Sequence, residues 1–571
     1  MSKPIYILGT GLSHDGSSCL MKDGKIVVAI EKERLTRKKH DGFNDNLTIE
    51  YCLNAENISF RDISLVVQEA TESQNYKPEE VVKRANRTIP EDIPKITISH
   101  HLAHAYSAIG TSPFDEMSVL VIDGQGSSMD SCIDFTPDLP FSNLYHIDEQ
   151  KKYWEFLSYY EFKHGKLKTL QKDFGEFYLW NRDELPAAPE DMLNSIGEFY
   201  DGISNYIFDK SFCEGKTMGL SSYGKGGVYN FDAFTIKGLK IELKHDWLRR
   251  FTKFKSGKYI GFAENFQYFA EIAFWAQQQL EKAVIRCFNN LYKLAPNKNV
   301  AYAGGVALNA VINSKIISNT EFENIYIQPA AGDNGLAIGC CYYGWIEYFK
   351  KSRLLHSGST YFGRSYKNSE VFSVLKEYSD VLLFSEEKEY VKIAAELLND
   401  GKIIGWFQDG CEFGPRALGH RSILANPIRK DIRNFINRKI KTREDFRPFA
   451  PSVLKEELKN YFECDFTESD YMLKVAKVKQ GFADKIPGVV HKDLSARIQT
   501  VDSKLTPKYY QLIKEFQERS GIPILLNTSF NGVNMPIIET PKQAIEFFVS
   551  VKNIDVLIIN DIVITDLKKE V

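Results

Sequence analysis

The sequence lacks the patterns that mark secreted and membrane-bound proteins. Its nine cysteines are scattered and none forms a Cys-x-x-Cys pair, which is the usage of a reducing compartment. No uninterrupted apolar run approaches the roughly 20 residues of a membrane span. The stretch Met1–Ile7 has no long apolar core behind a basic start, so no signal peptide is evident. We therefore expect a cytoplasmic protein without a membrane partner.

An excess of charge of either sign is also missing. The formal net charge is -3 over 571 residues, which gives no electrostatic basis for binding nucleic acid. The local basic run Arg34–Lys39 is typical of a solvated face. The chain is too long for one ordinary hydrophobic core, so we expect two or more domains.

Two histidines stand out against this background. Ile96–Ser99 alternates apolar and polar residues as a short strand does, and His100–Ala108 has no Gly or Pro and suits a helix. His100 and His104 would then share one helical face and could point two imidazoles at one ion. The alternative is a pair of hydrogen-bonded core histidines, because His serves both purposes. The zinc-protease pattern is excluded, since it needs Glu where this chain has His101.

Two acids strengthen the case for a metal. Asp123 ends the buried strand Val119–Asp123 before a Gly-rich turn, and Asp333 lies in the similar turn Ala330–Gly335. Either Asp alone is more often a turn-former than a ligand. Two imidazoles and two carboxylates together are a plausible set for iron, zinc or manganese.

Small-residue turns recur at the ends of predicted strands. The polar turn Gly11–Ser18, which contains His14, follows the strand Ile5–Gly9 and precedes a hairpin at Asp23-Gly24. Backbone N–H groups can face a phosphate in such a cradle. The place of His14 between two glycines favours a role in a site over a hydrogen bond within the turn.

A second strand and turn, ending at Asp123-Gly124, suggests a duplicated nucleotide-binding core. Gly304-Gly305 then forms a turn between a strand and a helix that begins near Asn309, where a nucleotide could approach the backbone. Residues 140 to 270 have the irregular patterning of an insertion, within which Gly215–Gly224 is either a substrate-contacting loop or an ordinary one. Phe266–Leu294 has helical spacing of apolar residues and predicts a core helix.

A second domain follows a boundary placed between Lys350 and Tyr378. It carries many cations and polar residues suited to phosphate or carboxylate: Arg416, Arg421, Lys439, Lys441, Arg443, Arg447, Arg497, Asn527, Thr528 and Ser529. The alternative is a solvated basic face. We favour a binding site, because Arg447 precedes Pro-Phe-Ala-Pro and Arg497 has apolar neighbours, and both contexts indicate partial burial.

Taken together, these motifs resemble the NodU/CmcH family of O-carbamoyltransferases over nearly the whole chain. The resemblance rests on His14-Asp15-Gly16, Glu31–Gly42, His100–His104, Asp123-Gly124, Gly304–Asn309, Gly332-Asp333, Phe413–Gly419, Arg443–Pro451 and Asn527–Phe530. One departure is Leu494-Ser495, where the family more often has Gly-Thr. The resemblance implies an α/β protein: an actin-like ATPase domain over 1–360, similar to the catalytic protein of tRNA threonylcarbamoylation, and a YrdC-like domain over 375–571.

The resemblance also implies a reaction. Carbamoyl phosphate is hydrolysed to carbamate in the C-terminal domain, ATP converts carbamate to carbamoyladenylate with release of pyrophosphate, and the N-terminal domain transfers the carbamoyl group to a hydroxyl of a small metabolite.

Each candidate residue receives a role from the same resemblance. A divalent metal, with iron expected and Mg²⁺ as a further ion, would be bound by His100, His104, Asp123 and Asp333. The base would be His14, and the second catalytic residue would be Arg447. Substrate would be bound by His40, Arg416, Lys441, Arg497, Asn527 and Ser529, and the nucleotide would be contacted by Gly124, Gly304, Gly305 and Asn309.

Two other functions remain open from the sequence. A tRNA-modifying enzyme of the threonylcarbamoyl-adenosine type would have similar halves, although the chain has no evident basic surface for RNA. A non-catalytic nucleotide-binding regulator would bind ATP without releasing pyrophosphate. A homodimer is an expectation that the sequence does not specify further.

Overall fold

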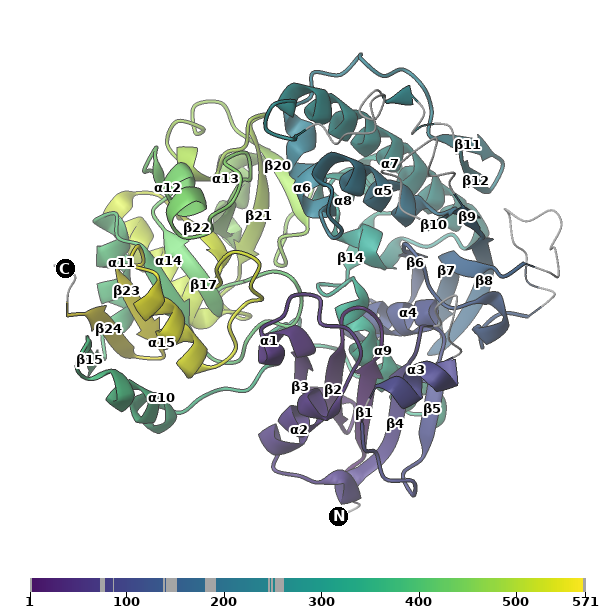
Figure 1. Cartoon of the computed structure of the whole chain (residues 1–571), viewed down its shortest axis with the longest axis horizontal. Helices are drawn as coiled ribbons and strands as arrows, with labels where there is room; N and C mark the ends of the chain where they lie inside the picture. Colours follow the sequence, from purple (N-terminus) through teal and green to yellow (C-terminus); the bar gives the residue numbers. More distant parts are fainter. Residues whose placement is uncertain are drawn as a thin grey trace. The chain divides into compact units, whose positions relative to one another are not determined.

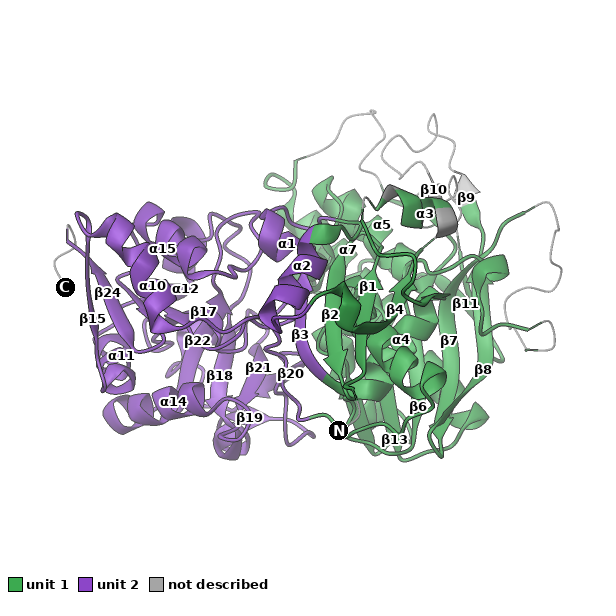
Figure 2. Cartoon of the chain, turned by 90° about the horizontal axis from the view of Figure 1, so that it is seen from below, with its two compact units in different colours: residues 1–25, 42–46, 59–356 green, residues 26–41, 47–58, 357–571 purple. Residues whose placement is uncertain are grey.

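The structure is a computed structural model, and its chain divides into two compact units (Figure 2). The structure describes residues 3–71, 78–85, 87–136, 139, 151–179, 191–244, 247, 250, 251 and 261–567. Unit 1 comprises residues 1–25, 42–46 and 59–356, and unit 2 comprises 26–41, 47–58 and 357–571. The functional domains expected at 1–360 and 375–571 stay predictions.

The first sheet follows the order β3-β2-β1-β4-β5 (Figure 1). Its strands are β1 (Tyr6–Gly11), β2 (Ser17–Lys22), β3 (Lys25–Glu31), β4 (Ile63–Glu69) and β5 (Lys95–Ile98). β1 pairs antiparallel with β2 and parallel with β4. The predicted hairpin is confirmed, and Asp23 and Gly24 both have positive φ, as the favoured two-residue hairpin turn requires.

The second sheet repeats this arrangement, with the order β14-β13-β6-β7-β8. Its strands are β6 (Met117–Ile122), β7 (Trp154–Lys163), β8 (Lys166–Gly175), β13 (Asn299–Ala303) and β14 (Asn324–Ile327). Its first strand, β6, pairs antiparallel with β7 and parallel with β13. Two sheets of this order are the arrangement of actin-like ATPase domains, which confirms the predicted class.

The second sheet also corrects the prediction of an insertion over 140–270. β7 and β8 belong to the core sheet, so the prediction is wrong for Trp154–Gly175. Residues 140–150, 180–190 and 252–260 of that stretch lie outside the described residues. The predicted loop Gly215–Gly224 is also wrong, because α6 (Glu214–Leu220) and the 3₁₀ turn Ser221–Tyr223 occupy most of it.

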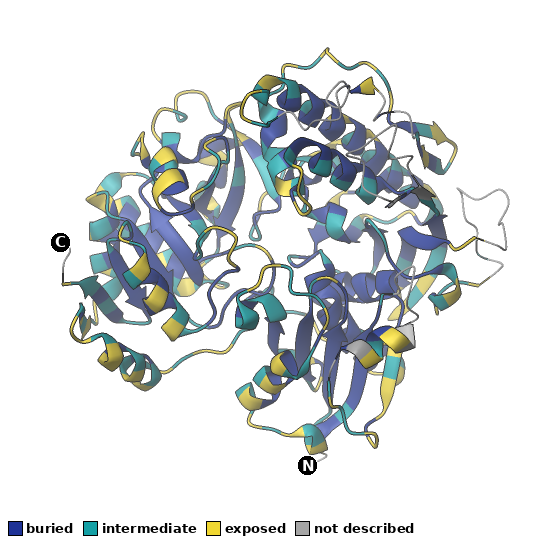
Figure 3. Ribbon diagram, viewed as in Figure 1, coloured by how far each residue is buried: buried dark blue, intermediate teal, exposed yellow. Residues whose placement is uncertain are grey.

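Helices α4 (His100–Thr111) and α9 (Leu336–Tyr343) pack against each other in unit 1. Both α4 and α7 (Phe266–Leu294) form where the sequence predicts them. Every residue of α4 is buried, as the dark blue of Figure 3 shows. The helices approach closely because Gly339 has no side chain: a Cβ there would lie 1.8 Å from the Ala103 carbonyl oxygen.

The remaining described helices of unit 1 lie around the second sheet or at the edges of the first. They are α3 (Pro78–Arg84), α5 (Ile196–Phe208) and α8 (Ala310–Asn313). Short strand pairs accompany them: β9 (Phe177–Leu179) with β10 (Asp191–Leu193), and β11 (Phe234–Lys237) with β12 (Lys240–Leu243). No described helix combines the length and the apolarity that crossing a bilayer requires.

Unit 2 is built on one mixed sheet with the order β15-β24-β23-β16-β17-β22-β18-β21-β20-β19. Its strands are β15 (Leu382–Glu386), β16 (Ile404–Phe407), β17 (Arg421–Ala425), β18 (Ala450–Leu454), β19 (Phe462–Glu463), β20 (Lys474–Val478), β21 (Ser495–Val501), β22 (Ile524–Ser529), β23 (Val556–Ile559) and β24 (Ile562–Asp566). Its helices are α1 (Lys32–Thr36), α10 (Asn368–Leu375), α11 (Tyr390–Asn399), α12 (Ile432–Lys439), α13 (Leu458–Tyr461), α14 (Pro507–Ser520) and α15 (Pro541–Ser550), and α2 (Asn46–Ala55) joins them from Leu47 onward.

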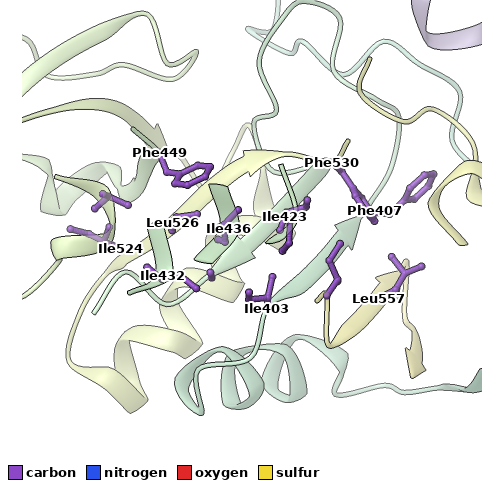
Figure 4. Packing of buried hydrophobic residues seen from close by; sticks show 14 of the residues in the cluster. Ile403, Phe407, Ile423, Ile432, Ile436, Phe449, Ile524, Leu526, Phe530 and Leu557 are labelled. Carbon is purple, nitrogen blue, oxygen red and sulfur yellow. The ribbon is translucent and has the colours of Figure 1, made fainter. Parts of the chain in front are cut away.

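Apolar side chains cover both faces of this sheet. Ile423 points into a core shared with α12 and α15 (Figure 4), whereas its neighbour Leu424 points to the opposite face, against α11 and α14. This alternation is the two-residue period of a strand buried on both sides. Unit 2 is therefore a second α/β unit, and the predicted fold class is confirmed.

The basic run Arg34–Lys39 is part of unit 2, and its interpretation as a solvated face is wrong for its first residue. Arg34 is 1% exposed, and its guanidinium donates to Glu31 at 2.5 Å and to the Gly414 carbonyl at 2.6 Å. Arg37 donates to the carbonyls of Pro536 and Ile537, both at 2.8 Å. These bonds tie an early segment to late parts of the chain.

Leu494, at the position where the family resemblance predicts Gly, adopts the backbone conformation that glycine favours. Its φ is 64°, a left-handed value that costs a branched residue about 1–2 kcal/mol. The Asp493 carboxylate accepts hydrogen bonds from the backbone and the hydroxyl of Ser495, which hold the turn. The loop therefore keeps this shape beside Arg497 without the glycine.

Candidate functional site

The histidines and acids predicted to bind metal converge in unit 1. His104 Nε2 lies 2.9 Å from Asp123 Oδ2, and His100 Nε2 lies 3.3 Å from the same atom. Asp333 Oδ1 is 3.4 Å from His100 Nε2 and 3.6 Å from His104 Nε2. The two Nε2 atoms are 3.2 Å apart. The structure thus gathers four donor atoms that come from three distant parts of the chain.

Each donor stands at the end of a strand or the start of a helix. α4 follows β5 directly and carries both imidazoles one turn apart, on the face that the four-residue spacing predicts. Asp123 follows the last residue of β6, and Asp333 begins the 3₁₀ turn that leads into α9. Because α4 packs on α9, the three segments meet at one point.

The spacing of the donor atoms fits a metal ion. Metal–nitrogen and metal–oxygen bonds of about 2.0–2.2 Å place neighbouring ligand atoms roughly 3.0–3.5 Å apart. The separations here run from 2.9 to 3.6 Å, and all four donor atoms lie within 4.8 Å of one another. Two imidazoles with two carboxylates suit iron, zinc or manganese.

The electrostatics of this cluster also favour a cation. Although burial opposes it, hydrogen bonds from His100 and His104 hold the pKa of Asp123 well below its usual range. Burial likewise opposes ionisation of Asp333, and the nearby imidazoles lower its pKa. Two charged carboxylates in a buried place need compensating positive charge, from imidazolium or from an ion.

Glu69, which the sequence did not single out, orients one of the imidazoles. It ends β4, is fully buried, and its Oε1 lies 2.8 Å from His100 Nδ1. The Thr71 hydroxyl donates to the same oxygen. A proton on Nδ1 directed at Glu69 leaves Nε2 of His100 as the donor for an ion, which is a common arrangement behind metal-bound histidines.

His14 joins the cluster through Asp333. Its Nε2 lies 3.2 Å from Asp333 Oδ2, and its Nδ1 lies 3.4 Å from Asp15 Oδ2. Its side chain is 52% exposed, with the Phe212 ring at a centroid distance of 5.3 Å. Partial desolvation of the ring acts to lower the pKa of His14, but the carboxylates of Asp333 and Asp15 outweigh it and raise the pKa to about 10.

The glycines predicted to contact nucleotide surround Asp123. The backbone N–H groups of Gly124 and Gly305 donate to Asp123 Oδ1 at 2.8 and 3.2 Å. Gly304 has φ 93°, and a Cβ there would lie 2.2 Å from the Ile122 carbonyl oxygen. Asn309 caps α8 by accepting from Ile312 N. Their contact with a nucleotide stays a prediction.

A second cluster, of cations, forms in unit 2. Arg416 lies between β16 and β17, Arg497 lies on β21, and Lys441, Arg443 and Arg447 lie between α12 and β18. The Nε atoms of Arg416 and Arg497 are buried and have no hydrogen-bond partner among the described residues. Arg443 donates to Asn437 at 2.7 Å and lies over the Phe449 ring.

These cations repel one another. Burial and then the charges of Arg416, Arg443 and Arg447 lower the pKa of Arg497 well below its usual value. Burial and the Arg447 charge lower the pKa of Arg416 to about 10. The pKa of Lys441 is also lowered well below its usual value, by burial, Arg443 and Arg447. An anion that entered this set would relieve the repulsion, and guanidinium groups suit phosphate or carboxylate.

Polar side chains complete this cluster. Lys441 Nζ donates to the Ser529 carbonyl and to Asn531 Oδ1 at 2.7 Å, and Ser529 donates to the same Asn531 oxygen. Asn527 donates to Gln499 at 2.9 Å, while its Oδ1 is buried without a partner among the described residues. The sequence analysis missed both Asn531 and Gln499.

Glu412, also missed, fixes the loop that carries Arg416. It is 1% exposed, and its Oε1 accepts from the backbone N–H groups of Leu418 at 2.6 Å, His420 at 2.8 Å and Arg421 at 3.2 Å. The guanidinium of Arg421 is itself buried and donates to the Gln408 carbonyl at 2.7 Å, so it holds structure rather than facing a ligand.

His40, predicted to bind substrate, belongs to unit 2. It has φ 53°, and its backbone N–H donates to Glu33 Oε2 at 3.0 Å. The structure therefore separates the predicted site residues into two groups. His14, the four metal-binding candidates, the three glycines and Asn309 belong to unit 1, and His40, Arg416, Lys441, Arg447, Arg497, Asn527 and Ser529 belong to unit 2.

Family comparisons cover both units. The family model described as "Carbamoyltransferase N-terminus" matches residues 6–91 and 76–342, and the model "Carbamoyltransferase C-terminus" matches residues 395–566.

Individual relatives match over most of their length. The uncharacterized protein sll1178 of Synechocystis sp. is 30% identical, over 98% of this chain and 96% of its own. The nodulation protein NolNO of Sinorhizobium fredii is 29% identical, over 94% of this chain and 77% of its own. Among solved structures, full-length HypF in its phosphate- and nucleotide-bound form aligns at 14% identity with a TM-score of 0.38, over 60% of this chain and 56% of that one.

Proposed function

The chain belongs to the carbamoyltransferase family, and from this premise we propose that it carbamoylates a hydroxyl of a small metabolite. The carbamoyl group would come from carbamoyl phosphate and pass through carbamoyladenylate at the expense of ATP. The observation that carries this proposal is the separation of two chemically different clusters. Unit 1 holds two imidazoles around two carboxylates, and unit 2 holds arginines whose buried Nε atoms find no partner in the described part of the chain.

Unit 2 is suited to prepare the activated group. Arg416 and Arg497 can bind the phosphate of carbamoyl phosphate bidentately, and the buried Asn527 Oδ1 needs a donor such as the carbamoyl NH₂. Water cleaves carbamoyl phosphate to carbamate and phosphate. The carbamate oxygen then attacks the α-phosphate of ATP, so that carbamoyladenylate forms and pyrophosphate leaves. Cations fixed beforehand stabilise the charge that develops in both steps.

Unit 1 is suited to the transfer itself. The acceptor hydroxyl attacks the carbamoyl carbon, AMP leaves, and the hydroxyl proton must go to a base, for which His14 is the candidate. The metal held by His100, His104, Asp123 and Asp333, with iron expected, would supply positive charge that offsets the charge of the adenylate phosphate. Among the charged neighbours, the Asp333 carboxylate raises the pKa of His14 most. A cation bound to Asp333 would therefore lower that pKa.

The experiment uses carbamoyl phosphate labelled in its carbonyl carbon, ATP and a panel of hydroxylated small molecules. We expect pyrophosphate release that depends on carbamoyl phosphate, and a product heavier than its acceptor by one carbamoyl group. Label that reaches only added tRNA would establish the tRNA-modifying alternative instead. ATP binding without any pyrophosphate release would point to a regulator.

Replacing Glu69 by Gln should weaken metal binding without removing a ligand. The amide can present its NH₂ group to His100 Nδ1, which favours the wrong tautomer and turns the Nε2 lone pair away from the metal. We expect affinity for Fe²⁺ or Co²⁺ to fall about 10- to 100-fold, measured by titration of the metal-free protein. Glu347→Gln is the matched control, because Glu347 accepts a hydrogen bond from Tyr106 near the middle of the same helix and contacts neither imidazole of the donor set; an equal loss there would contradict the assigned role.

A further inference from the structure

A buried network of acids, a lysine and hydroxyl groups lies behind α4, separate from the face that carries the metal-binding candidates. Glu155, on β7, and Lys172, on β8, are both fully buried and form an ion pair. Lys172 Nζ also contacts Asp134 Oδ2 at 3.0 Å and donates to the hydroxyls of Tyr160 and Ser158 at 3.1 and 3.3 Å. A lysine with this many partners is held in one position.

This network caps the first turn of α4. The first N–H groups of a helix have no partner inside the helix, and the usual capping residue, Ser99, makes no capping bond. Its hydroxyl instead donates to Asp134 Oδ1 at 2.6 Å. The N–H of His100 donates to Ser127 Oγ at 2.9 Å, and the N–H of His101 donates to Glu155 Oε1 at 2.9 Å.

The Ser127 hydroxyl and the Glu155 carboxylate therefore cap α4 together, and Glu155 supplies the charge. The positive end of the helix dipole favours an anion at this point, and Lys172 stabilises that anion in a buried place. Glu155 Oε1 also accepts from Ser127 N at 3.2 Å, so one carboxylate fixes both the helix and the segment that follows Asp123. His101 lies beside the same carboxylate, with its Nδ1 3.9 Å from Glu155 Oε2 and 2.8 Å from Ser158 Oγ.

We propose that Glu155 and Lys172 are positioning residues that set the orientation of His100 and His104 toward the ion. They touch neither imidazole of the metal-binding candidates. They act by fixing the axial position and rotation of the first turn of α4, which carries His100 and leads into the turn that carries His104. This inference rests on the proposed metal role of unit 1. It assigns a role in positioning to Glu155 and Lys172, which are not among the four metal-binding candidates.

The closing experiment compares Glu155→Gln with the wild type in the metal-free state by hydrogen exchange, followed by Co²⁺ titration. Gln keeps the shape of the side chain but removes its charge. That charge holds the N–H groups of His101 and Ser127 and pairs with Lys172. We expect amides at the start of α4 to exchange at least about tenfold faster, and Co²⁺ affinity to fall about 10- to 100-fold. The absorption bands of bound Co²⁺ should shift, because altered ligand geometry changes them.

Arg353→Met is the matched control, since Arg353 holds the other end of the same helix. Its guanidinium donates to the carbonyls of Ile109 and Ser112 at 2.8 and 2.6 Å. Its loss should speed exchange at the end of α4 and leave Co²⁺ affinity within about twofold, because the imidazoles lie in the first turns. If Arg353→Met weakens Co²⁺ binding as much as Glu155→Gln does, general destabilisation explains the effect and the inference is overturned.

A double variant keeps the test decisive if Glu155→Gln folds poorly. The combination of Glu155→Gln with Lys172→Met removes both charges of the pair, so no lysine charge is left buried beside a neutral amide. The backbone amides at the start of α4 should still exchange faster than in the wild type. Exchange and Co²⁺ binding both equal to the wild type would refute the positioning role. A wild-type protein that binds no metal would sink the proposed metal centre, while the exchange data would still decide whether the pair anchors α4.

Discussion

Replacing Arg497 by Met is expected to stabilise the ligand-free protein while strongly slowing its pyrophosphate release. Arg497 sits among Arg416, Arg443 and Arg447, whose charges lower its pKa. Because the charge is disfavoured in the folded state, a neutral side chain of similar length should raise the free energy of unfolding of unit 2 by about 1–4 kcal/mol. Pyrophosphate release should fall about 10²- to 10³-fold, since a fixed cation that stabilises developing charge is lost.

Thermal unfolding with and without inorganic phosphate measures both effects. Phosphate should raise the melting temperature of the wild type, because it binds the folded state, and should do so much less for the variant. Arg438→Met is the control: Arg438 belongs to the same unit, its side chain is 64% exposed, and it pairs with Asp445. Its loss should change neither stability nor turnover appreciably. A destabilised Arg497→Met protein that still responds to phosphate would contradict the anion site.

Replacing Asp123 by Asn should abolish metal binding and carbamoyl transfer. Asn keeps the size of the side chain but removes one charge from the donor set, and its amide cannot accept from both Gly124 and Gly305 while also binding an ion. We expect metal affinity to fall more than about 100-fold, because losing a ligand costs more than losing a residue behind a ligand. Metal content by mass spectrometry and product formation are the measurements.

A matched variant separates the loss of charge from the loss of a ligand. Asp115, which follows α4 in the same unit, has a fully exposed side chain, so Asp115→Asn removes the same charge from the surface. That protein should bind metal and form product like the wild type. Asp123→Asn protein that retained stoichiometric metal would show that the four residues serve another purpose, such as a hydrogen-bonded core.

The sequence predicted those parts of the site that local pattern determines. The four-residue spacing of His100 and His104 places them on one helical face whatever the rest of the fold does, and the helix forms where expected. Asp123 and Asp333 were recognisable because each follows a strand or a turn marked by glycine. Residues whose position depends on a local sequence pattern can therefore be predicted from the sequence.

The supporting residues could not be predicted in this way. Glu69, Glu155 and Lys172 lie within or at the ends of strands, and nothing in their neighbourhood distinguishes them from solvent-exposed positions of the same pattern. Only the pairing of β7 with β6 and β8 brings Glu155 to α4. The long irregular stretch after residue 140 concealed these two core strands, because their aromatic and charged residues lack clear alternation.

The central claim is that unit 2 makes the activated carbamoyl group and unit 1 transfers it. A single turnover with labelled carbamoyl phosphate and ATP, followed for both pyrophosphate and carbamoylated product, tests it most directly in two variants. Arg497→Met should slow the appearance of both about 10²- to 10³-fold, whereas Asp123→Asn should release pyrophosphate at close to the wild-type rate and form no product. Loss of pyrophosphate release in Asp123→Asn, or product formed at the wild-type rate by Arg497→Met, would contradict this division.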